Sequence, residues 1–184
     1  MISILGGAGG FIWPLALCSL ASVFIIIERA IGLRFKAIVP ESLVESLCTG
    51  KVIIPKEFPT VRELMQFQQR HPKDTEGLRS LAQLQVNSLQ RGLFLLETIV
   101  GIAPLIGLLG TVWGLIKVFS AIDAQSGLPD AAVFVEGIAL ALSTTLMGLC
   151  IAIVALVGNH YLRRKIEGIA SRLQFVVERL VALG

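Results

Sequence analysis

The chain is 184 residues long, the length of a single domain, yet 54% of its residues are hydrophobic and only 16% are charged. These fractions exclude an average soluble domain. The net charge of +3 is unevenly placed, because residues 1–27, 98–116 and 137–159 contain no Asp, Glu, Lys or Arg. Each stretch approaches or exceeds the roughly 20 apolar residues that a helix needs to cross a bilayer. The composition predicts an all-α integral membrane protein with three transmembrane helices, forming one membrane domain over residues 1–184.

The first span is predicted over residues 11–27. It lacks the basic start and the small-residue cleavage site of a signal peptide, and it ends in Ile27-Glu28-Arg29, so we expect it to be retained. A helical segment over residues 28–92 follows. Its early prolines and Gly50 exclude one long helix and leave two short ones, over residues 41–47 and 60–69.

The second span is predicted over residues 93–119, with a helix that begins well before it. Asp74 is a suitable N-cap, and leucines at roughly helical spacing follow it. Because no strong helix breaker stands between Gly77 and Ala103, we expect one helix to run from Asp74 into the membrane. Pro104 is then expected to kink it.

An outer loop is predicted over residues 120–133, a third span over residues 134–161 and a helical tail over residues 162–184. In the tail, apolar residues form one stripe between charged and amide side chains, which is typical of a helix packed on one face. These residues are Ile166, Ile169, Leu173, Val176, Val177 and Leu180. We expect the tail to pack against the other helices outside the membrane.

The basic residues orient these spans. Ten of the sixteen lie between the first and second spans, and five follow the third. The positive-inside rule predicts an outer N-terminus, cytoplasmic helical extensions at 28–92 and 162–184, and a cytoplasmic C-terminus. Lys117 is the exception, and its long side chain can reach the outer interface.

The sequence contains no recognisable enzyme, cofactor or metal motif. Cys18, Cys48 and Cys150 are widely spaced, and His71 and His160 are the only histidines. No disulfide or metal-ligand pattern fits these positions. We therefore expect no enzyme activity, no metal and no cofactor, and look for the function in the spans.

Small and hydroxyl residues gather in the second and third spans. Gly107, Gly110, Thr111 and Gly114 share one helix face, and small residues of this kind allow close packing of membrane helices. The third span offers a matching stripe with Ala141, Thr145, Gly148 and Ala152, together with Ser143 and Thr144. These positions suit either simple helix packing or a slightly polar surface.

A proton path built from these spans alone would lack a carboxylate. Asp123, Asp130 and Glu136 all lie toward the outer side, whereas proton relays ordinarily use titratable groups at membrane depth. Hydroxyl groups pass protons on but store them poorly near neutral pH. If the protein conducts protons, a partner has to supply the buried acid.

Residues 101–116, GIAPLIGLLGTVWGLI, resemble the second-helix signature of the ExbB/TolQ/MotA family, and the match is closest to ExbB and TolQ. Residues 137–153 resemble the third-helix pattern, and the stretch from Phe11 to Arg29 is similar to the first helix and its boundary. Two departures are Leu140, where ExbB and TolQ often have Glu, and Val154, where proline is usual.

The resemblance implies a bacterial inner-membrane protein that forms a homo-oligomeric ring around an ExbD/TolR-type single-span partner carrying a membrane Asp. In that ring a proton path is lined by Thr111 and Thr145, together with Ser143 and Thr144. Proton motive force then drives envelope transport, with a TonB/TolA-type protein as a further partner. Glu136 is either a proton acceptor at the path entrance or a solvated interface residue. A Tol-Pal-type maintenance subunit and a non-conducting membrane scaffold, suggested by Leu140, remain as alternatives.

Overall fold

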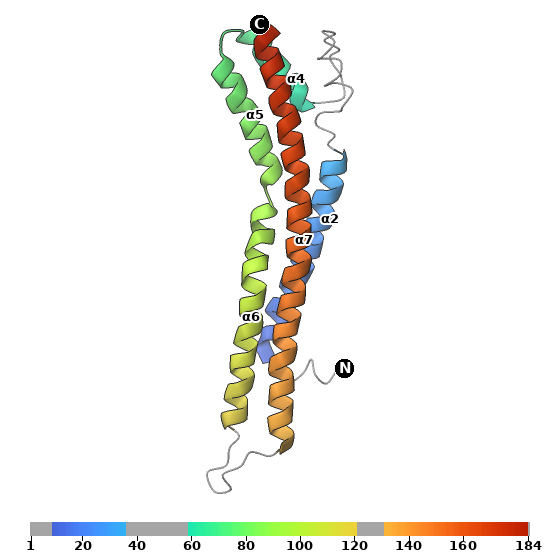
Figure 1. The fold of residues 1–184 in the computed structure, drawn as a ribbon, viewed down its shortest axis with the longest axis vertical. Helices are drawn as coiled ribbons and strands as arrows, with labels where there is room; N and C mark the ends of the chain where they lie inside the picture. The colour runs from blue at the N-terminus through green and yellow to red at the C-terminus, as the bar shows by residue number, and fades with distance from the viewer. Residues whose placement is uncertain (1–8, 36–58, 121–130, 184) are drawn as a thin grey trace. The chain divides into compact units, whose positions relative to one another are not determined.

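The computed structural model describes residues 9–35, 59–120 and 131–183, and every element in these ranges is helical. A short 3-10 helix, η1, precedes the α-helices, and the α-helices are labelled in Figure 1. The elements are η1 (Gly9–Phe11), α2 (Ile12–Phe35), α4 (Pro59–Arg70), α5 (Thr75–Gln90), α6 (Leu93–Ser120) and α7 (Ala131–Leu183). The short helix predicted over residues 41–47 lies outside the described residues, as do residues 121–130 of the predicted outer loop.

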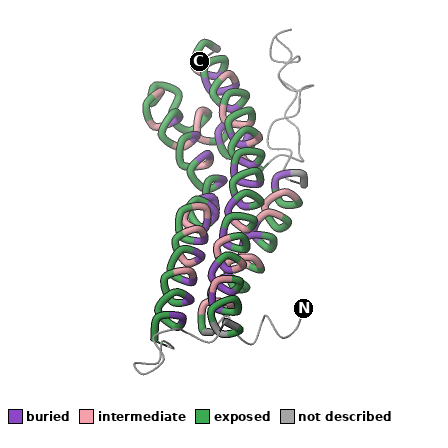
Figure 2. Tube along the Cα trace, turned by 60° about the horizontal axis from the view of Figure 1, so that its bottom comes forward, coloured by how far each residue is buried: buried purple, intermediate pink, exposed green. Residues whose placement is uncertain are grey.

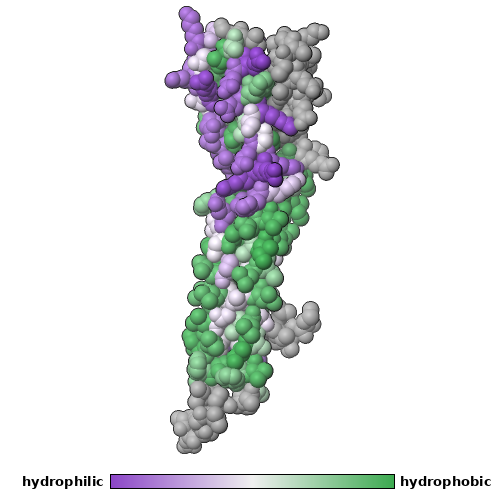
Figure 3. All heavy atoms as spheres, viewed as in Figure 1, coloured by the Kyte–Doolittle hydropathy of each residue, from purple (hydrophilic) through white to green (hydrophobic). Residues whose placement is uncertain are grey.

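Among the described residues, three helices are long and apolar enough to cross a membrane: α2, α6 and the part of α7 that starts at Phe134. The prediction of an all-α membrane protein is confirmed. The chain divides into two units, which we name by their surfaces (Figure 3). The apolar unit comprises residues 1–27 and 94–159, and the polar unit comprises residues 28–93 and 160–184.

Within the polar unit, α4 and α5 form a helical hairpin. The helix predicted over residues 60–69 is confirmed as α4, which buries Val61 and Leu64. Asp74 is the N-cap of α5, as predicted, and its Oδ1 accepts a hydrogen bond of 2.8 Å from the backbone N–H of Gly77. The cap satisfies one of the amide groups that a helix leaves unpaired at its start.

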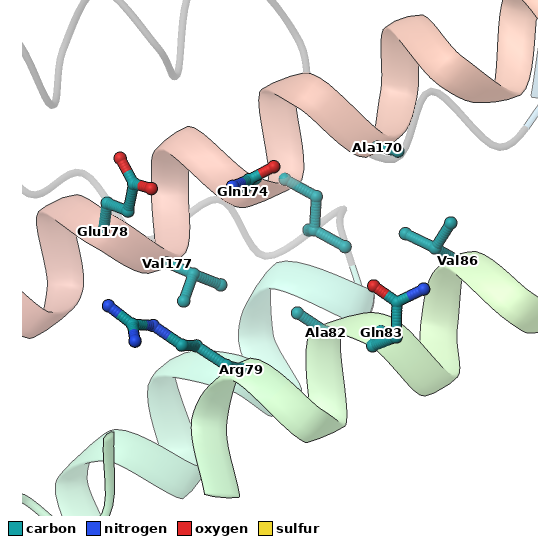
Figure 4. Close-up of a pocket in the computed structure, with 9 residues that line it drawn as sticks. Arg79, Ala82, Gln83, Val86, Ala170, Gln174, Val177 and Glu178 are labelled. Atoms are coloured by element: carbon teal, nitrogen blue, oxygen red, sulfur yellow. The ribbon is translucent and has the colours of Figure 1, made fainter. Parts of the chain in front are cut away.

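The tail of α7 belongs to the same unit and packs through the predicted stripe. Ile166, Leu173, Val176, Val177 and Leu180 are buried, and Ile169 is half-buried. A groove between α5 and α7 has Val86, Leu173 and Val177 among its apolar lining residues (Figure 4). The prediction that the tail packs on other helices is confirmed, and its place outside the membrane stays a prediction.

The predicted single helix from Asp74 into the second span is wrong. α5 ends at Gln90, α6 begins at Leu93, and Gly92 between them has φ +91°. Glycine has no Cβ and adopts this left-handed conformation without steric cost, so the chain breaks here. Pro104, in contrast, lies inside α6 without ending it.

Asp74→Ala is expected to destabilise α5 by about 1 kcal/mol, because the N–H of Gly77 loses its acceptor. Hydrogen exchange of the α5 amides in the detergent-solubilised protein measures this directly. Ser80→Ala, an exposed substitution in the middle of the same helix, is the control and is expected to leave exchange nearly unchanged. Equal exchange in the two variants would contradict the capping role.

Candidate functional site in the α6 and α7 pair

The two helices α6 and α7 approach each other through backbone surfaces that only small residues permit. A Cβ added to Gly148 would lie 2.6 Å from the carbonyl oxygen of Ala103, and one added to Gly114 would lie 2.9 Å from that of Gly137. Gly107 is equally close to the backbone of α7, at 3.0 Å from the Thr145 Cα. Buried positions therefore recur along both helices (Figure 2).

Thr144 occupies the centre of this contact. Its side chain is only 1% exposed and packs against Gly110, where an added Cβ would clash with it. Its Oγ1 donates to the carbonyl oxygen of Ala141 at 2.9 Å and lies 3.5 Å from that of Gly107. The structure thus places Thr144 and Ala141 in the packing between the helices.

Thr145 lies beside Thr144 and reaches across to the other helix. Its half-buried side chain donates a hydrogen bond of 3.1 Å from Oγ1 to the backbone carbonyl oxygen of Gly107. This bond joins α7 to α6 at membrane depth, where few other polar partners exist. Because Gly107 has no Cβ, the Thr145 backbone can approach closely enough to form this hydrogen bond.

Thr111 follows Gly107 by one turn of α6. Its Oγ1 donates to the Leu108 carbonyl oxygen at 2.7 Å, within its own helix. Helical geometry places Thr111 about 40° from Gly107 in one direction and Gly110 about 60° in the other. Since Thr145 packs at Gly107 and Thr144 at Gly110, Thr111 and Thr145 lie on the same side of the α6 and α7 pair. We call this side the hydroxyl edge.

Helix α2 and the preceding η1 pack on the opposite side. The rings of Phe11 and Trp113 are 6.3 Å apart between centroids, and Ile26 packs where Gly158 has no side chain. Around α6, Trp113 lies beyond Gly110 on the side away from Thr111. Around α7, Gly158 lies beyond Thr144 on the side away from Thr145. Helix α2 therefore leaves the hydroxyl edge uncovered within the described part of the apolar unit.

Ser143 and Glu136 do not share the hydroxyl edge. Ser143 donates to the Ala139 carbonyl oxygen at 2.7 Å, and Glu136 is exposed. Both are turned by roughly 160–180° from Thr145 around α7. Consecutive helical residues differ by about 100°, so the three hydroxyl residues predicted as one cluster point in three directions.

Sequence reasoning missed two features of the pair. Gly137 packs against Val118 with no room for a Cβ. The sequence signal for this contact was a glycine within the charge-free residues 137–159. Asn159 is 5% exposed, and its Oδ1 has no hydrogen-bond partner in the structure. The sequence signal for Asn159 was its polar amide at the end of the apolar residues 137–159. Leu140, where the resemblance expected Glu, is buried.

Within the described residues, no three His, Cys, Asp or Glu side chains gather as metal ligands. Cys18 is half-buried and Cys150 is exposed, and both are free thiols. The chemistry available at the hydroxyl edge is therefore that of the threonine hydroxyls and the backbone carbonyl of Gly107.

Comparison with known proteins identifies relatives along most of the chain. Biopolymer transport protein exbB1 of Vibrio cholerae is 31% identical over 169 residues, which cover 82% of this chain and 73% of that protein. Putative biopolymer transport protein ExbB-like 3 of Synechocystis sp. is 34% identical over 172 residues, 85% of this chain and 82% of its own length. The putative biopolymer transport protein ExbB homolog of Methanothermobacter thermautotrophicus is 29% identical over 117 residues, which cover 63% of this chain. The match spans only 41% of that protein's own length.

The family model described as the MotA/TolQ/ExbB proton channel family matches residues 58–174. That range contains α6, both threonines of the hydroxyl edge and the close glycine contacts with α7. The resemblance found in the sequence is confirmed, with ExbB proteins among the relatives. This chain belongs to the MotA/TolQ/ExbB proton channel family.

Proposed function

We propose that this protein is the multi-span subunit of a proton channel that energises biopolymer transport, and that it is not an enzyme. The observation that carries the proposal is the hydroxyl edge, where Thr111 and Thr145 lie on the same side of a closely packed helix pair and α2 leaves that side uncovered. The family match and the relatives named as biopolymer transport proteins support the same function.

The proposed path needs a second protein. Residues 98–119 and 137–159 contain no carboxylate, and threonine hydroxyls relay a proton without holding it near neutral pH. A single-span partner of the ExbD/TolR type would supply a membrane Asp beside the hydroxyl edge. Several copies of this chain would surround that helix, each presenting Thr111 and Thr145 to it.

The proposed location is the bacterial inner membrane, with the N-terminus outside and the C-terminus in the cytoplasm. The basic residues support this orientation, because ten lie between the first and second spans and five follow the third. Protons would enter from the outer side and leave toward the cytoplasm. A TonB/TolA-type protein would then receive the mechanical work.

Purified chain and partner, reconstituted together in vesicles with a pH-sensitive dye inside, test the proposal. An imposed proton gradient is expected to collapse faster than in protein-free vesicles, and Asp→Asn in the partner span is expected to restore the protein-free rate. The control is the chain reconstituted alone, which is expected to conduct no better than lipid. The chain alone and the Asp→Asn pair are both expected to lack flux because the partner carries the titrating group.

The same experiment separates the channel from a membrane scaffold. A scaffold would bind the partner and yet give the protein-free rate with both proteins intact. Co-purification of the two chains provides the independent check on binding. Binding without flux would overturn the channel and leave the scaffold.

A further inference from the structure

The break between α5 and α6 is covered by an arginine from α2. A Cβ added to Gly92 would lie 3.0 Å from the Nε and 3.3 Å from the Nη2 of Arg29, so the guanidinium lies directly on this glycine. The Arg29 Nε is buried and has no hydrogen-bond partner in the structure. A buried guanidinium donor without an acceptor is costly, which indicates that an acceptor is missing.

Positive charge accumulates at this point. Arg91 is exposed and directly precedes Gly92, and α6 begins immediately afterwards at Leu93. The unpaired amides at a helix start carry a partial positive charge, and the first turn of α6 contains no acidic residue. The Arg29 guanidinium therefore packs on Gly92, and Arg91 and the start of α6 flank this glycine along the chain, so an anion bound here would meet positive charge.

The position along the chain indicates which anion. The first candidate membrane span, Ile12–Leu33, contains Arg29 in its last turns, and the second starts at Leu93, directly after Arg91 and Gly92. Both arginines therefore stand at the membrane boundary, at the depth of lipid phosphates. In the orientation proposed above this is the cytoplasmic face, where basic groups attract anionic lipids.

We propose that Arg29 and Arg91 bind the phosphate of an anionic phospholipid headgroup at the start of α6. Arg29 supplies its guanidinium beside Gly92, turning toward the headgroup to present the buried Nε, and Arg91 supplies a second charge from the solvent side. The lipid would hold the end of α2 against the connection between α5 and α6. A soluble phosphate has the same chemistry and is distinguished by the experiment.

Native mass spectrometry of protein released from vesicles with equal parts phosphatidylglycerol and phosphatidylcholine tests this site. Wild-type protein is expected to retain phosphatidylglycerol preferentially. Arg29→Gln is expected to lower that preference about fivefold, the effect of one arginine at a membrane surface. Arg91→Gln is expected to lower it less, and Arg62→Gln, an exposed arginine on α4, not at all.

Retention by Arg29→Gln equal to wild type, or equal wild-type retention of both lipids, would overturn the proposal. If Arg29→Gln does not fold, Arg91→Gln and the charge-preserving Arg29→Lys carry the test, and unchanged retention in both would overturn it. Millimolar inorganic phosphate that stabilises lipid-free protein as much as phosphatidylglycerol does would assign the site to soluble phosphate instead. The measurement uses no proton gradient, so its failure is separate from that of the channel.

Discussion

Gly148→Ala is expected to lower the free energy of unfolding of the detergent-solubilised protein by about 1–3 kcal/mol, the usual cost of overpacking a tight contact. The added Cβ would lie 2.6 Å from the Ala103 carbonyl oxygen and 3.2 Å from the Gly107 Cα. Both atoms belong to the backbone of α6, so no side-chain rotation relieves the clash. The helices have to separate, which also weakens the bond from Thr145 to Gly107.

Gly101→Ala is the matched control for this experiment. Gly101 lies on α6, and a Cβ added there has no atom within 4 Å. Titration with a denaturing detergent, followed by circular dichroism, compares the two variants with wild type. Gly101→Ala is expected to leave the free energy of unfolding unchanged or to raise it by up to about 1 kcal/mol, because alanine is the better helix former. Equal stability of the two variants would show that the close approach of α6 and α7 contributes nothing.

Hydrophobic composition was sufficient to predict the membrane class, because a bilayer demands long apolar helices with satisfied backbones. The N-cap at Asp74 and the buried stripe of the tail were also predictable, since each depends on residues close together in sequence. The break at Gly92 was not predicted. A lone glycine is tolerated in many helices, and its positive φ depends on contacts such as that with Arg29 from another helix.

The candidate site was predictable in its residues and less so in its arrangement. The sequence pattern selected Gly107, Gly110 and Thr145, which the structure places at or beside the helix contact. It could not tell which of two neighbouring threonines enters that contact. That choice depends on the rotation of α7 against α6, and the structure buries Thr144 where a stripe through Thr145 was expected.

This difference between neighbouring threonines provides the sharpest test of the hydroxyl edge. Thr145→Val keeps the shape of the side chain and removes its hydroxyl, and it is expected to reduce proton flux through the chain and its partner about tenfold or more. The reason is that one hydrogen bond to a charged group contributes roughly 1.5–3 kcal/mol, and 1.36 kcal/mol corresponds to a factor of ten in rate. Flux in the reconstituted vesicles is the measurement, and Thr145→Ser is expected to conduct.

Thr144→Val is the control because it makes the same chemical change one residue away. Each valine removes a hydroxyl that donates to a backbone carbonyl, at Ala141 for Thr144 and at Gly107 for Thr145. Both variants should therefore lose about 1 kcal/mol of stability, so a general weakening of the fold would reduce flux equally in both. Only a proton path along the hydroxyl edge predicts that Thr144→Val conducts while Thr145→Val does not. Unchanged flux in Thr145→Val would remove this threonine from the path.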